Sequence, residues 1–169
     1  MKNLPAQAIA IILLISIVVC GLTYPFCSAI FKLYNASGLL LDYSVSYYKI
    51  RVIGLPFTLY TFAVFGVFRG LQNTYYPMLI AITGSFINII LDIILVYGIN
   101  GIFMPLNLKG AAIASVIAQI LMAVLSTHFL LKKTEISLNF SRSINKEIPR
   151  FINMIGHLII RTLALNTAL

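Results

Sequence analysis

Residues 78–97 of this chain, MLIAITGSFINIILDIILVY, form a 20-residue apolar run that carries a single charged side chain, Asp92. A helix that crosses the hydrocarbon core of a bilayer needs about 20 predominantly apolar residues. The run therefore predicts a transmembrane helix. Pro77 would lie in its first turn, where the missing backbone N–H does little harm.

Other runs of the same kind predict further membrane helices. They cover residues 6–31, with Pro25 as the place for a kink, residues 52–68, residues 111–131 and residues 151–169. The sequence thus predicts an all-α fold, a polytopic bundle of membrane-spanning helices.

The segments between these runs complete the predicted organisation. Residues 1–131 would hold four transmembrane helices, with the polar and aromatic residues 35–48 at the membrane interface. Residues 132–150 form the longest polar stretch, and residues 151–169 begin another helix. That last run ends at Leu169 without a polar flank, which favours a fragment of a longer membrane protein over a complete small one.

The composition also indicates lipid as the surrounding medium. The chain is 60% hydrophobic and 9% charged, whereas about 25% of a soluble domain is charged. Its net charge of +8 does not indicate a nucleic-acid partner, because the basic residues lie mainly at the ends of apolar runs. Counting Lys and Arg puts the 132–150 loop in the cytoplasm, with seven basic residues inside and four outside. The four outside are Lys32, Lys49, Arg51 and Lys109.

Asp92 is the strongest functional candidate in the sequence. A charged side chain at the centre of a membrane helix costs roughly 2.5–3.5 kcal/mol on insertion scales. Asn88 precedes it by four residues, so both side chains would lie on one helix face, one turn apart. The pair could hold Na⁺ through oxygens or, because burial disfavours a charged carboxyl, take up and release a proton. The alternative is that the two side chains only bond neighbouring helices together.

Other polar residues within the runs give weaker signals. Ser115 could add an oxygen ligand, and its run could instead simply pack through small residues. Gln119 and Arg161 are candidate substrate or charge partners, Arg161 for a carboxylate elsewhere in the protein. Cys20 and Cys27 are expected to be buried, inert thiols. Because no nucleophile–base pair, phosphate loop or metal cluster is evident, we expect neither an enzyme nor a cofactor beyond the coupling ion.

Several motifs, in order, resemble one family of transporters. They are YKIRVIGLP at 48–56, FRGLQNT at 68–74 followed by Pro77, NIILD at 88–92, GAAIAS at 110–115 and IRTLAL at 160–165. Together they resemble the multidrug and toxic compound extrusion (MATE) family. The last motif is similar to the family's bacterial DinF-like branch.

The resemblance implies a fold and a site. This chain would supply helices three to six of the N-terminal lobe and part of helix seven, and further helices of the full-length transporter would be its partners. Asn88 and Asp92 would be the Asn–Asp pair of the family's N-lobe cation site. Ser115 would take the place of a hydroxyl on helix six.

The resemblance also implies a function. It is that of a secondary active antiporter in the inner (plasma) membrane, which exports drugs or small organic metabolites in exchange for H⁺ or Na⁺ by alternating access. Two alternatives stay open, namely a lipid-linked sugar flippase of the same superfamily and a non-transporting membrane assembly subunit.

Overall fold

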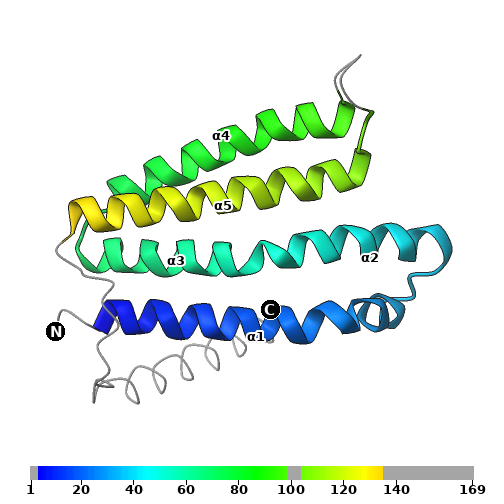
Figure 1. The fold of residues 1–169 in the computed structure, drawn as a ribbon, viewed down its shortest axis with the longest axis horizontal. Coiled ribbons are helices and arrows are strands. Elements are labelled where there is room, and N and C mark those ends of the chain that lie inside the picture. Colours follow the sequence, from blue (N-terminus) through cyan, green and yellow to red (C-terminus); the bar gives the residue numbers. More distant parts are fainter. Residues whose placement is uncertain (1–3, 99–103, 135–169) are drawn as a thin grey trace, which may run out of the picture.

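The computed structural model describes residues 4–98 and 104–134, and every secondary-structure element in this part of the chain is an α-helix (Figure 1). The helices are α1 (Leu4–Leu33), α2 (Gly38–Ile53), α3 (Leu55–Gly70), α4 (Tyr75–Tyr97) and α5 (Asn107–Lys133). α1, α4 and α5 are each long and apolar enough to cross a membrane, and α2 with α3 passes as one span bent by 44°. The predicted all-α membrane bundle is therefore confirmed. The predicted helix at 151–169 and the loop beyond residue 134 lie outside the described residues.

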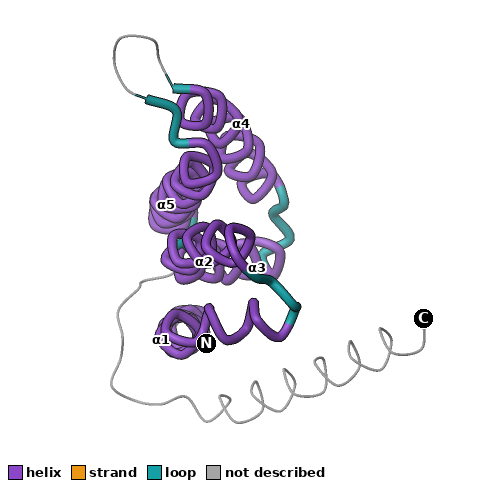
Figure 2. Tube along the Cα trace, turned by 90° about the vertical axis from the view of Figure 1, so that its right-hand side faces the viewer, coloured by secondary structure: helices purple, strands orange, loops and turns teal. Residues whose placement is uncertain are grey.

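The spans lie side by side in a row. α1 packs against α2 and α3, this bent pair packs against α5, and α5 packs most extensively against α4 (Figures 1 and 2). Successive spans run in opposite directions, so their termini form two opposite sides of the bundle. Arg69, Lys132 and Lys133 lie on one side, and Lys32 and Lys109 lie on the other. The apolar spans thus carry basic residues at both ends, as the sequence predicted.

The side of the bundle that contains Gly70 holds a packed apolar core. Ile9 from α1, Val64 and Phe68 from α3 and Leu130 from α5 are buried together there. This cluster joins α1, α3 and α5 through large side chains that fill the space between them. Many large apolar side chains point outward instead, as is expected of helices whose surroundings are lipid or other helices.

Residues 38–53 differ from the sequence-based prediction. An interfacial connection over 35–48 and a helix starting at Val52 were predicted, but α2 begins at Gly38. No Gly, Pro or Asn interrupts residues 39–53, so the helix has no reason to stop, although polar Tyr and Ser side chains lower its hydropathy.

This difference also moves Arg51. The residue was counted as an external flanking charge, yet it lies 13 residues beyond Gly38, about 20 Å along the helix, near the middle of the bent span. The count of external basic residues therefore falls from four to three.

The bend between α2 and α3 has an identifiable cause. Pro56 has no N–H to donate to the carbonyl of Val52, and its ring crowds that carbonyl. The Cys20 thiol of α1 donates to the Val52 carbonyl at 3.4 Å, so the freed acceptor is satisfied by a neighbouring helix. Pro25 lies inside α1, where a kink was predicted, and the C-terminal turns of that helix leave the axis of its longer part (Figure 2).

α4 and α5 approach each other through small residues. A Cβ added at Gly84 would collide with the Met122 side chain, and one at Gly110 would collide with the backbone carbonyl of Leu95. Ala112, Ala114 and Ala118 of α5 are buried. Small residues of α5 thus pack against α4, the arrangement that the sequence left open beside a ligand role for Ser115.

Candidate functional site

A polar cavity of about 130 Å³ lies where α2, α4 and α5 meet. Three of the predicted site residues line it, namely Asn88 from α4 and Ser115 and Gln119 from α5. Arg51 from α2 adds a charged side chain to the wall between these helices. The remaining lining residues are Gly84, Ser85, Ala118 and Met122. We refer to this space below as the polar cavity.

Several polar atoms around the polar cavity are buried without a hydrogen-bond partner. They are Nη1 of Arg51, Nδ2 of Asn88 and Oε1 of Gln119. An unsatisfied buried donor or acceptor costs about 1–3 kcal/mol, and a charged group costs more. These atoms are therefore available to a ligand or to water, and they do not bond one helix to another.

Asp92 lies one turn beyond Asn88 on α4 and is half-buried. Its Oδ1 atom is also buried without a hydrogen-bond partner, but the residue does not line the polar cavity. Asn88 therefore lies between the polar cavity, which it lines, and the carboxyl group of Asp92, one helical turn away. Arg161, the remaining candidate, lies outside the described residues.

The bend at Gly54 shapes the polar cavity. A Cβ at Gly54 would collide with Oε1 of Gln119, so the glycine leaves the room that the Gln119 side chain occupies. Sequence reasoning missed Arg51 as a site residue because its position resembled the flank of an apolar run. The signal was a helix-compatible stretch followed by Gly54 and Pro56, which is typical of a bend inside a span.

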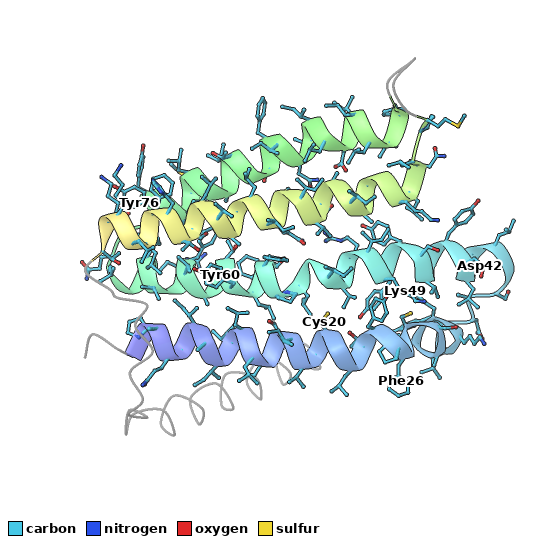
Figure 3. All side chains as sticks on the ribbon, in the orientation of Figure 1. Cys20, Phe26, Asp42, Lys49, Tyr60 and Tyr76 are labelled. Atoms are coloured by element: carbon cyan, nitrogen blue, oxygen red, sulfur yellow. The ribbon has the colours of Figure 1, made fainter. Side chains whose placement is uncertain are left out.

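A second cavity, which is mainly apolar, lies between α1, α3 and α5. Its volume is about 380 Å³, within the range of roughly 300–1,000 Å³ that small-molecule pockets occupy. Its lining residues are Leu13, Pro56, Phe57, Tyr60, Ile120, Ala123, Val124 and Thr127. The Tyr60 side chain points toward α5 (Figure 3), where its hydroxyl and that of Thr127 share a hydrogen bond of 2.6 Å. We call this space the apolar cavity.

Comparison with known proteins decides the family. The family model described as MatE matches residues 1–94, which is more than half of the chain. The chain belongs to the MATE family. The relationship that the motifs indicated is therefore confirmed.

Two curated proteins illustrate how far the likeness extends. This MATE chain is 32% identical over 156 residues to "Protein DETOXIFICATION 43" of Arabidopsis thaliana, covering 85% of the chain and 28% of that protein. It is 28% identical over 123 residues to "Multidrug export protein MepA" of Staphylococcus haemolyticus, covering 73% of the chain and 26% of that protein. The chain thus spans little more than a quarter of the length of each relative.

A solved structure shows the same fold. It is described as the inward-facing conformation of a multidrug resistance MATE family transporter of the MOP superfamily, and it superposes with a TM-score of 0.79 at 20% identity. The match covers 92% of this chain and 35% of that one. The chain is accordingly a multi-pass membrane protein with a MATE arrangement of helices.

Proposed function

We propose that this MATE chain supplies the ion-coupling helices of a secondary active exporter. Asp92, beside Asn88, binds an inward-moving cation, and a small organic molecule leaves the cell in exchange. The observation that supports this proposal most directly is that Oδ1 of Asp92 and Nδ2 of Asn88 are both buried, without hydrogen-bond partners, on a membrane-spanning helix. Ionisable groups in such places are expensive, and they typically mark ion pathways or proton relays.

The surroundings of Asp92 favour H⁺ over Na⁺ as the coupling ion. Ser115, which was expected to add an oxygen ligand, lines the polar cavity together with the positively charged Arg51, and Asp92 does not. A metal cation needs several oxygen ligands, and a fixed positive charge beside some of them repels it. A proton needs only one acceptor, which the carboxyl group of Asp92 supplies.

The exchange requires two conformations with different affinities for the ion. A cation that binds only one conformation shifts the population toward it, and a substrate that favours the other is released. Alternating access around a site near the midplane, in the plasma membrane, is the mechanism that fits a bundle of this kind. The apolar cavity has a suitable volume for part of a small organic substrate. The name of the MepA relative, a multidrug export protein, supports the same direction of transport.

The test compares two carboxylates of the same chain. Asp92→Asn, with the chain expressed in its native genomic context, should abolish export of a fluorescent organic substrate driven by an imposed pH gradient. Asp42→Asn is the matched control, because Asp42 is exposed near the outer end of α2 (Figure 3), and it should leave the export rate within about twofold of the wild type. Export that survives in Asp92→Asn would contradict the proposal. Replacing the pH gradient by a sodium gradient identifies the ion.

A further inference from the structure

The polar cavity carries a positive charge that the ion-exchange proposal does not use. Arg51 is the one charged residue among the described residues that line it, and its Nη1 atom is buried without a hydrogen-bond partner. A guanidinium stays protonated in proteins, so it cannot avoid the cost of burial by losing its proton. A buried charge is tolerated when it is paired and hydrogen-bonded. Nη1 of this half-buried side chain is therefore free to take a negative partner in the cavity.

The other polar groups of the cavity suit an anion as well. Nδ2 of Asn88 is a second buried donor without a partner. The Ser115 hydroxyl can donate, and the Gln119 amide can present its N–H₂ group after a half-turn about its last bond. Two helices, α4 and α5, thus place neutral donors around the cavity into which α2 brings one guanidinium.

The volume of the cavity suits a small occupant. A volume of about 130 Å³ corresponds to about four water molecules at roughly 30 Å³ each. A chloride ion, or a carboxylate group with one or two further atoms, fits that volume. One guanidinium neutralises one negative charge, so a monovalent anion is the natural occupant.

We propose that the polar cavity is a binding site for a small monovalent anion, held by Arg51 with Asn88 and Ser115 as additional donors. Chloride and the carboxylate end of an organic acid share this chemistry. The site is separate from the carboxyl group of Asp92, although Asn88 lies between the two. Protonation of Asp92 removes a nearby negative charge, so proton and anion favour each other's binding.

The experiment measures anion binding without transport. The purified chain is placed in nanodiscs of zwitterionic lipid, in HEPES buffer, whose anion is too bulky for the cavity, and the ³⁵Cl resonance of added chloride is recorded. We expect line broadening that saturates with protein, and an affinity at least about tenfold weaker in Arg51→Gln, because hydrogen bonds to charged groups are strong. Ser115→Ala should weaken binding about fivefold. Arg69→Gln, at an exposed arginine of α3, should change nothing.

Two further measurements distinguish chloride from a carboxylate as the bound anion and detect variants that fail to fold. Acetate that narrows the chloride line competes for the site, which assigns the anion to the carboxylate class; acetate without effect assigns it to chloride. Helical content by circular dichroism is recorded for each variant, and Arg51→Lys, which keeps the charge, should bind with intermediate affinity. Asp92→Asn should bind chloride at least as tightly as the wild type. Broadening that is absent from the folded wild type, or unchanged in Arg51→Gln, would overturn the proposal.

Discussion

The half of the helix bundle on the Gly70 side and the opposite half are built differently, although the same spans run through both. Around Phe68 and Leu130 the space between helices is filled by large apolar side chains. Around Arg51 and Asn88 it is left open, and the buried polar atoms there have no hydrogen-bond partner. The difference separates two roles: the apolar half holds the spans together, and the polar half is free to bind ions.

Residue size explains how one sequence produces both halves. In the polar half Gly54 leaves the room that the Gln119 side chain occupies, and Gly84 leaves the room for the Met122 side chain. In the apolar half Val64, Phe68 and Leu130 fill that room. Substitutions should therefore act on stability in the apolar half and on binding in the polar half.

The largest expected loss of stability comes from the apolar half. Phe68→Ala removes a ring that is 1% exposed, and truncation of a buried Phe typically costs about 3–5 kcal/mol. Unfolding in mixed detergent micelles with increasing dodecyl sulfate measures it. Phe86→Ala is the control, because that ring is 64% exposed, and its effect should stay within about 0.5 kcal/mol. Equal losses in the two variants would remove the distinction between the halves.

A smaller loss is expected where α4 and α5 meet. Gly110→Ala puts a Cβ against the backbone carbonyl of Leu95, which cannot turn aside as a side chain can, so the helices must separate at a cost of about 1–3 kcal/mol. Gly66→Ala faces open space, and it should be neutral or slightly stabilising because alanine favours helix. The same detergent titration reads both. A neutral Gly110→Ala would show that the close approach does not contribute to stability.

The smallest expected effect concerns the hydrogen bond between the Tyr60 and Thr127 hydroxyls, 2.6 Å long. Interhelical hydrogen bonds in membranes contribute about 0.6 kcal/mol on average, so Tyr60→Phe should cost about that much. A double-mutant cycle with Thr127→Val isolates the bond from the packing of the ring. A coupling energy of zero would mean that the bond in the apolar half is as dispensable as those missing from the polar half.

Length and hydropathy were sufficient to predict most of the fold. The runs that became α1, α4 and α5 are apolar over more than 20 residues, and nothing in tertiary packing overrides such a signal. The error at α2 has a physical cause. Tyr and Ser side chains lower the hydropathy of residues 38–53 but do not break a helix. A criterion based on apolar runs therefore predicts a loop where the backbone continues as a helix.

The candidate site was predictable only where it lies on one helix. The spacing of Asn88 and Asp92 fixes their common face, and the structure leaves buried, unpartnered atoms on both. The meeting of Asn88 with Ser115 was expected from the family resemblance, whereas Gln119 was predicted only as a substrate or charge partner. Arg51 could not be placed, because its entry into the polar cavity depends on the direction of the α2–α3 bend.

The most direct test asks whether Asp92 is reached from water, as a residue that exchanges cations must be. The purified chain in nanodiscs is treated with a water-soluble carbodiimide and a nucleophile, and the modified carboxyl groups are mapped by mass spectrometry. We predict modification of both Asp92 and the exposed Asp42, with a rate at Asp92 that sodium leaves unchanged. Modification of Asp42 alone would mean that Asp92 is sealed within helix packing, and it would contradict the ion-exchange role proposed for it.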